Sequence, residues 1–442
     1  MRRTRVKIVA VREEPATPCW PCIDHDADKE LARVTGPVIQ RNPDIDFDVV
    51  SYTQASQAEA DYAQDLKTYD GVLVLLLTCW KGIDVFYAMQ SRDGIPTIVA
   101  DVPFCGSGSM LWTTVSTVRD NDLPVPLLST LDYAEIADAV RIFDVLAKMR
   151  QTTVLVVQDA AETGHGNRAE LCRRFGETWG VRFVAAGSEE FLRYMSAVPE
   201  AEAEAIADRW AAESVEVREP SKEDIIESAR VYVAVRNMMN DKGAQAVTLD
   251  CLGLSYTGAY GEHRHFYPCL SHFEMLNNGI VAVCEADLNS TVTELLIKYM
   301  TGRPGFVSDP VIDTSSGQII YAHCVACRKV YGCEDARSCR YAIRSHAEDK
   351  KGASVQVIFP AGDDVTTLIV YPDFACIHSG RAVGNVGLDE GCRSKLAAEI
   401  DAEKVLYNWR GAWHRVTVFG DYRKEFIRLF HSRGLKVFEE DR

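Results

Sequence analysis

The stretch GIVAVCEADLNSTVTELLIKYMTGRPGF, residues 279–306, contains the strand and the helix on which the fold of this chain depends. Its first part, GIVAVCEAD, is an apolar run of strand length, which is typical of a strand buried on both faces of a parallel sheet. The segment after it carries apolar residues at helical spacing, at positions 292, 295, 296, 299 and 300. The sequence therefore predicts a buried strand followed at once by an amphipathic helix.

Two carboxylates, Glu285 and Asp287, separate this strand from this helix. Thr291 and Glu294 fit a capping box for the helix, so capping does not require either carboxylate. Buried carboxylates need a cation or hydrogen-bond donors, and α/β folds build sites at the carboxyl ends of strands. The pair therefore indicates either a functional site or a structural salt bridge. We expect Asp287 to face the site and Glu285 to point to the opposite face.

The composition favours a globular protein of two or three domains. The chain has 442 residues, of which 47% are hydrophobic and 25% charged. Its 48 basic and 64 acidic residues give a net charge of −16, which argues against nucleic acid as a partner. No apolar run is long enough to span a bilayer. The apolar stretch within the first 15 residues is too short for a signal peptide. We therefore expect a cytoplasmic protein that has no membrane partner.

The order of predicted elements divides the chain into three parts. Residues 1–150 alternate strand-like runs, such as RVKIVAV (5–11) and GVLVLLL (71–77), with amphipathic segments. This alternation predicts an α/β domain with a parallel, Rossmann-like sheet, and residues 151–245 predict a second one. From 246 to 442 strands such as VTTLIVYP (365–372) follow one another with few helices between them. That pattern predicts an antiparallel C-terminal domain.

Further candidates for chemistry lie on both sides of the opening stretch. Glu274, in YPCLSHFEMLNNG (267–279), could return to the end of the strand through a short helix, although surface exposure is the common state of a glutamate. His414 lies between Trp413 and a predicted strand, where a packed core histidine is the usual alternative. His323 and His346 are weaker candidates. Carboxylates combined with imidazoles are a ligand set for a divalent metal.

The cysteines and one glycine-rich motif give weaker signals. Cys324 and Cys327 form one C-x2-C pair, but Cys333 and Cys339 have the spacing C-x5-C, unlike zinc ribbons and fingers, so buried free thiols are favoured over a zinc site. CWPC (19–22) contains a C-x-x-C pattern, for which incidental loop thiols are the favoured interpretation. GHGNRAE (164–170) matches a dinucleotide fingerprint. The preceding strand ends near residue 157, however, too far away for the tight turn that such a site requires.

Five motifs taken in order indicate a family. They are CEADLNSTVTELLIKYMTGRPGF (284–306), QIIYAHCVA (318–326), IRSHAEDKKGAS (343–354), GCRSKL (391–396) and WHRVTVFGD (413–421). Together they resemble the L-fucose isomerase and L-arabinose isomerase superfamily, and in particular its shorter fucose isomerase-like branch. The resemblance is sharp over residues 246–440 and looser before them.

This resemblance implies two N-terminal α/β domains, a C-terminal domain with an antiparallel barrel-like part, and a symmetric homo-oligomer. It also implies Mn²⁺-dependent interconversion of an aldose and a ketose. The family's metal ligands correspond by motif to Glu274, Asp287 and His414, with Asp250 as the alternative to Glu274. The arabinose branch adds a second histidine, which corresponds to His346. The chain is much shorter than the fucose enzymes, and its cysteine-rich segment 327–340 departs from them, so the sugar does not transfer.

The residue types suit an ene-diol mechanism. Glu274 and Asp287 would act as base and acid on adjacent carbons, and His414 would anchor the metal that stabilises the enediolate. Two other classes of function stay open at this point. One is a different metal-assisted sugar enzyme, such as an epimerase, a lyase or a glycoside-cleaving enzyme. The other is a non-catalytic sugar-binding protein on the same fold.

Overall fold

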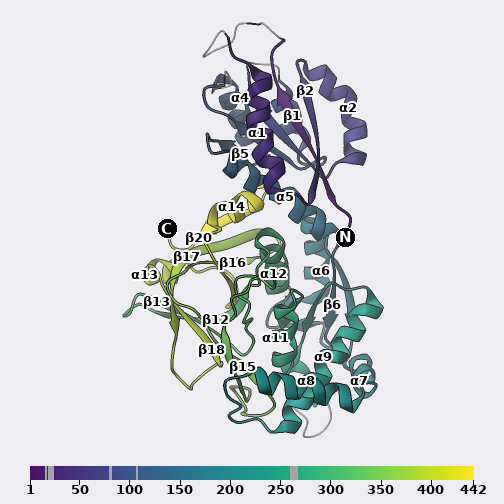
Figure 1. The fold of residues 1–442 in the computed structure, drawn as a ribbon, viewed down its shortest axis with the longest axis vertical. Helices are drawn as coiled ribbons and strands as arrows, with labels where there is room; N and C mark the ends of the chain where they lie inside the picture. Colours follow the sequence, from purple (N-terminus) through teal and green to yellow (C-terminus); the bar gives the residue numbers. More distant parts are fainter. Residues whose placement is uncertain (15–16, 18–23, 79–81, 106–107, 259–266) are drawn as a thin grey trace. The chain divides into compact units, whose positions relative to one another are not determined.

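The computed structural model describes residues 1–14, 17, 24–78, 82–105, 108–258 and 267–442. The described residues form two compact units (Figure 1). The first comprises residues 1–148 and 424–437, and the second comprises residues 149–423 and 438–442. The C-x-x-C motif at 19–22 lies outside the described residues.

The first unit is built on a five-stranded parallel sheet with the strand order β2-β1-β3-β4-β5. Its middle strand, β3, consists of valine and leucine after Gly71 and is buried along its whole length, as expected for a sheet covered on both faces. The strands are β1 (Thr4–Val11), β2 (Ile45–Tyr52), β3 (Gly71–Leu76), β4 (Thr97–Asp101) and β5 (Leu127–Ser129). The helices are α1 (Ala27–Arg41), α2 (Ala55–Thr68), α3 (Ile83–Gln90), α4 (Gly108–Asp120), α5 (Tyr133–Gln151) and α14 (Arg423–His431).

The second unit begins with a four-stranded parallel sheet in the order β11-β10-β6-β9. Its strands are β6 (Thr153–Val157), β9 (Arg182–Ala186), β10 (Ala246–Leu249) and β11 (Val281–Cys284), and a two-stranded hairpin, β7 (Glu162–Thr163) and β8 (Gly166–Asn167), follows β6. The helices are α6 (Arg168–Trp179), α7 (Ser188–Ser196), α8 (Glu200–Glu213), α9 (Lys222–Lys242), α10 (Cys251–Tyr256), α11 (Cys269–Asn277) and α12 (Leu288–Thr301).

Antiparallel strands complete the second unit. The strand order is β16-β19-β12-β13-β18-β17-β20, and β16 also pairs with β17, so that six of these strands close into a ring. They are β12 (Phe306–Asp313), β13 (Gln318–His323), β16 (Asp364–Val370), β17 (Phe374–Asn385), β18 (Ser394–Glu399), β19 (Arg415–Phe419) and β20 (Lys436–Glu439). A hairpin, β14 (Arg340–Arg344) and β15 (Ser354–Ile358), and helix α13 (Ala402–Asn408) lie outside this order.

The predicted fold class is confirmed at the level of its sheets: parallel in the N-terminal part and antiparallel in the C-terminal part. The predicted boundary at 245/246 does not separate compact units. The reason is that β10 and β11 hydrogen-bond into the sheet of β6, so residues 246–284 complete the second parallel sheet. Helix α12 then contacts strands of both sheets of the unit, β10 and β11 on one side and β16 and β19 on the other. None of the described helices combines the length and the apolar character that crossing a membrane requires.

A buried ion pair fixes the chain beside His414. The Arg415 guanidinium donates to both carboxylate oxygens of Glu440, at 2.6 and 3.2 Å, and both side chains are fully buried. The same guanidinium donates to the backbone oxygen of His414 at 2.9 Å. His378 Nδ1 lies 2.9 Å from Glu440 Oε2 and completes the polar cluster. The last residues of the chain thus hold the start of β19 in place.

We expect Glu440→Ala to lower the free energy of unfolding by about 3–5 kcal/mol, because the variant leaves the Arg415 charge buried and unpaired. Urea-induced unfolding measures this change, and Glu390→Ala, at an exposed position, is the matched control. A loss no larger than that of the control would show that the pair contributes little to stability.

Candidate metal centre

The site begins with a left-handed turn at the end of β11. Glu285 and Ala286 have φ values of 66° and 51°, a conformation that costs a residue other than glycine about 1–2 kcal/mol. Residues two apart in a strand share a face, and the turn after Cys284 does not separate the two carboxylates. The expectation that Glu285 faces away from Asp287 is therefore wrong: both carboxylates contact the same imidazole, that of His165.

Asp287 is the N-cap of α12. Its Oδ1 accepts from the backbone N of Asn289 at 2.9 Å and of Ser290 at 3.2 Å, and its Oδ2 accepts from the Ser290 hydroxyl. The predicted capping box is wrong because the helix begins three residues earlier than Thr291. The Thr291 hydroxyl donates back to the Asp287 carbonyl at 2.6 Å, and Glu294 points into the core.

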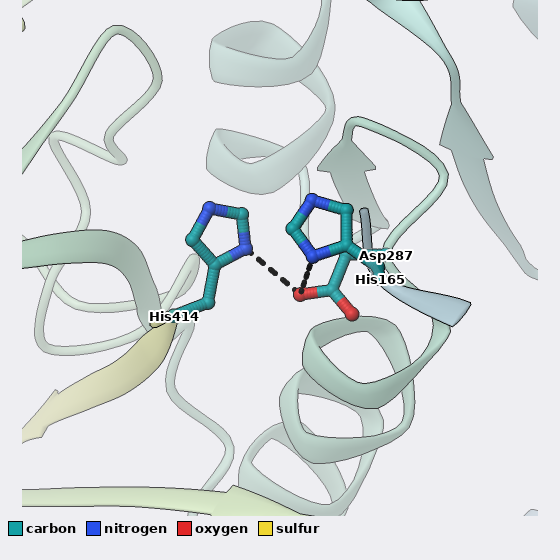
Figure 2. Close-up of side chains that lie close together, drawn as sticks. All are labelled: His165, Asp287 and His414. Carbon is teal, nitrogen blue, oxygen red and sulfur yellow. Dashed lines mark hydrogen bonds and ion pairs between the residues drawn. The ribbon is translucent and has the colours of Figure 1, made fainter. Parts of the chain in front are cut away.

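His414 binds the same carboxylate from the antiparallel sheet. Its Nδ1 lies 2.8 Å from Asp287 Oδ2 (Figure 2), and its Nε2 lies 3.0 Å from Oδ1 of Asp309. The pairing of β12 with β19 explains the second contact, since Ser308 is opposite Arg415 and Asp309 therefore lies beside His414. Asp287 and His414, both predicted from the sequence, thus meet although 127 residues separate them.

His165 reaches the site from the hairpin that follows β6. Its Nε2 is 3.0 Å from Glu285 Oε2 and its Nδ1 is 3.8 Å from Asp287 Oδ2. Its ring stacks on that of His414, with centroids 4.6 Å apart and planes inclined by 26°. Figure 2 shows both rings directed at the Asp287 carboxylate. His165 therefore lies between the two carboxylates.

A further side chain, that of His323 at the end of β13, lies 3.6 Å (Nε2) from Glu285 Oε1. Two overlapping groups of three result, each with its candidate ligand atoms within 4.8 Å of one another. One is His165, Asp287 and His414, and the other is Glu285, His323 and His414. Two imidazoles and one carboxylate are a common donor set for divalent transition metals, so the residues fit such an ion.

Hydrogen bonds between these groups reverse the usual effect of burial on their pKa values. Burial alone would lower the pKa of His414, but its bonds to Asp287 and Asp309 raise that pKa well above the usual value. Burial would likewise raise the pKa of Asp287, but His414 lowers it to about 2. His165 and His323 lower the pKa of Glu285 against the effect of burial. A metal would therefore compete with protons for the imidazoles.

Glu274 does not join this cluster. Its Oε1 accepts from Arg209 Nη2 at 2.7 Å, and its Oε2 accepts from the Trp210 indole at 3.2 Å. Glu274 lies near the C-terminal end of α11, which leads into the amino end of β11, whereas Asp287 follows the carboxyl end of that strand. The short helix thus returns the carboxylate to the opposite end of the strand from the one expected.

The other predicted ligands also lie outside both groups of three. Asp250 follows β10 and caps α10, with its Oδ1 accepting from the Gly253 backbone N at 3.0 Å. The His346 ring stacks on Tyr267 with centroids 3.8 Å apart, and its Nδ1 lies 3.7 Å from Asp349 Oδ1.

The cysteine-rich segment forms no metal group among the described residues. The Cys327 thiol donates to Oδ1 of Asn277 at 3.1 Å, and Cys333 lies 3.7 Å from Glu334 Oε1. The described cysteines are free thiols.

Comparison with known protein families and with curated proteins gives no match for this chain. The resemblance of its motifs to the sugar isomerases therefore stays an expectation, and the site has to be interpreted from its own geometry.

The turn at Glu285 and Ala286 gives a prediction about stored strain. Ala286→Gly should raise the free energy of unfolding by roughly 1 kcal/mol, because glycine lacks the Cβ whose clash makes a φ of 51° costly for alanine. Urea-induced unfolding of the two proteins measures the difference. Equal or lower stability of the variant would mean that the turn is not strained.

Glu294, on α12, carries another buried carboxyl. Its Oε1 accepts from the Gly305 backbone N at 2.8 Å, while its Oε2 has no hydrogen-bond partner among the described residues. Glu294 and His323 both line a small enclosed cavity with room for about one water molecule. Burial raises the pKa of Glu294 from 4.5 to about 7, although the bond from Gly305 opposes this.

This shift predicts a stability that depends on pH. Because the folded pKa of Glu294 is the higher one, the contribution of the neutral carboxyl is complete below pH 4.5 and is lost as the pH rises to about 7. Relative to Glu294→Gln, the unchanged protein should therefore lose on the order of 3 kcal/mol of unfolding free energy between pH 5 and pH 8. Glu204→Gln, at an exposed position on α8, is the control. A difference independent of pH would contradict the shift.

Proposed function

We propose that the chain is a divalent-metal-dependent aldose–ketose isomerase that acts through an ene-diol intermediate. The observation that supports it most is the contact of Asp287 with His414, 2.8 Å long, in a buried cluster of carboxylates and imidazoles. These two residues are among the ligands that the motif resemblance implies. Two ligands of one metal ion must lie close together, as these two do.

The residues proposed to hold the ion are His165, Asp287 and His414, which come from three segments of the second unit. Mn²⁺ is the proposed ion, and when bound it would stabilise the negative charge that develops on two adjacent sugar oxygens. Asp287 is suited to a fixed position, because backbone N–H groups, a hydroxyl and an imidazole all donate to it. His165 replaces Glu274 in the proposed ligand set, since Glu274 is bound by Arg209 and Trp210.

Glu285 is the proposed base. Its side chain is 22% exposed, against 2% for Asp287, so that a substrate could approach it more readily. Burial favours a raised pKa of Glu285, but hydrogen bonds with His165 and His323 lower that pKa, so that the carboxyl is present as the carboxylate that a base requires. One carboxylate can remove a proton from one carbon and return it to the adjacent carbon, since the two carbons are neighbours in the ene-diol.

Other metal-assisted sugar reactions would use the same residues. An epimerase would return the proton to the same carbon on the other face, and a lyase would expel a leaving group. A non-catalytic sugar-binding protein would show no exchange of carbon-bound hydrogen. The identity of the product therefore distinguishes these functions.

The direct test is a panel of aldoses incubated in D₂O with the protein and Mn²⁺, followed by chelation of the metal and NMR. We expect a ketose product with deuterium at C1. Glu285→Gln and Asp287→Asn should each slow turnover by on the order of 10²–10⁴, the range for loss of an acid–base group.

Glu274→Gln is the discriminating control, since the structure keeps its carboxylate away from the cluster and turnover should stay close to that of the unchanged protein. Full turnover of both site variants, or a loss confined to Glu274→Gln, would contradict the assignment.

A further inference from the structure

The two ring nitrogens of His414 face two different groups of candidate ligands. Nδ1 lies 2.8 Å from Asp287 Oδ2, in the group that also contains His165. Nε2 lies 3.8 Å from Glu285 Oε2, in the group that also contains His323. Because both groups share His414, the nitrogen that is free of hydrogen decides which group can hold an ion.

Asp309 is a carboxylate beside Nε2 of His414 that belongs to neither group. Its Oδ1 lies 3.0 Å from Nε2, within hydrogen-bond distance, whereas Glu285 Oε2 at 3.8 Å lies beyond that distance. Nε2 carries a single hydrogen, so it donates to the closer of the two carboxylates. A ring nitrogen that carries this hydrogen has no lone pair left for a metal.

The position of the Asp309 carboxylate is fixed by its surroundings. Asp309 lies on β12, which pairs with β13 on one side and with β19 on the other. Next to this point the Trp413 indole donates to the Pro310 oxygen at 2.9 Å and joins the segment before β19 to β12. Asp309 Oδ2 accepts from the Cys392 thiol at 3.9 Å, while Oδ1 lies next to His414. None of these contacts requires a bound ion.

We propose that Asp309 is a positioning residue that selects the nitrogen of His414 available to the metal. Its carboxylate retains the hydrogen on Nε2, so Nδ1 is the nitrogen that can bind an ion together with His165 and Asp287. The same selection keeps Glu285 out of the ligand set and leaves it available as the proposed base. This role of Asp309 rests on the proposed function, which supplies the ion.

Removal of the Asp309 carboxylate should have two effects on metal binding. The ring of His414 loses the acceptor that fixes its orientation, and its hydrogen is free to occupy Nδ1, where it blocks the ion. Loss of an outer partner of this kind typically weakens metal affinity about 10–100-fold. Asp309→Asn keeps an oxygen that accepts from Nε2, so this variant should retain most of the affinity.

The direct test is ¹⁵N NMR of the full chain labelled at histidine, without metal and with Zn²⁺, a diamagnetic ion. The signals of His414 are those absent from His414→Gln. In the unchanged protein we expect Zn²⁺ to shift Nδ1 of His414 and to leave the hydrogen on Nε2. Loss of the hydrogen from Nε2 on addition of Zn²⁺ would overturn the proposal, because the ion would then lie with Glu285 and His323.

Mn²⁺ binding to variants measures the effect on affinity. Asp309→Ala should bind Mn²⁺ about 10–100-fold more weakly than the unchanged protein, and Asp309→Asn should stay close to it. Asp313→Ala, on the same strand but in the turn with Ser315, is the control. Full affinity of Asp309→Ala, or equal losses in the alanine and asparagine variants, would refute the selection of one nitrogen.

These readouts separate the role of Asp309 from the proposed function. Binding through Nδ1 with the expected order of affinities, but without a ketose product, would refute the isomerase and leave the role of Asp309 intact. Ketose formation with the ion bound through Nε2 would refute the role of Asp309 alone. If the unchanged protein bound neither Mn²⁺ nor Zn²⁺, both would fail.

Discussion

The Asp287 carboxylate is the interaction on which the site and its surroundings depend. The side chain is 2% exposed, and a charge so deeply buried is stable only when donors surround it. The donors come from two directions: the first turn of α12 and the imidazole of His414 at the start of β19. One carboxylate therefore begins the helix that packs between the two sheets of the unit and binds the antiparallel sheet to the carboxyl end of β11. His414 is held in turn by the buried pair of Arg415 and Glu440.

The left-handed turn before Asp287 explains why the site contains two carboxylates rather than one. An extended strand would send Glu285 and Asp287 to the same face only if it continued regularly through both residues, and α12 would then begin later. The turn ends the strand at Cys284, directs Glu285 toward His165 and His323, and places Asp287 at the helix terminus. Strain at this position thus accompanies a close approach of acidic and basic groups, as functional sites often show.

The sequence was sufficient for the sheets and for the central pair of the site, and insufficient for what surrounds the pair. Apolar runs of strand length identify β11 and the helix after it, and polar residues at strand ends identify Asp287 and His414 as candidates. Glu274 could not be placed, because the direction in which a short helix returns to a strand depends on packing against Arg209 and Trp210. His165 was missed although its position, in a loop after the carboxyl end of β6, follows the same rule that identified Asp287.

The most direct measurement of the central claim is the binding of Mn²⁺ to the metal-depleted, reduced protein at neutral pH, followed by electron paramagnetic resonance of the free ion. We predict one bound ion per chain, with affinity lowered strongly in His165→Ala, Asp287→Asn and His414→Ala and unchanged in Glu274→Gln. Binding that all four variants retain, or no binding by the unchanged protein, would contradict it.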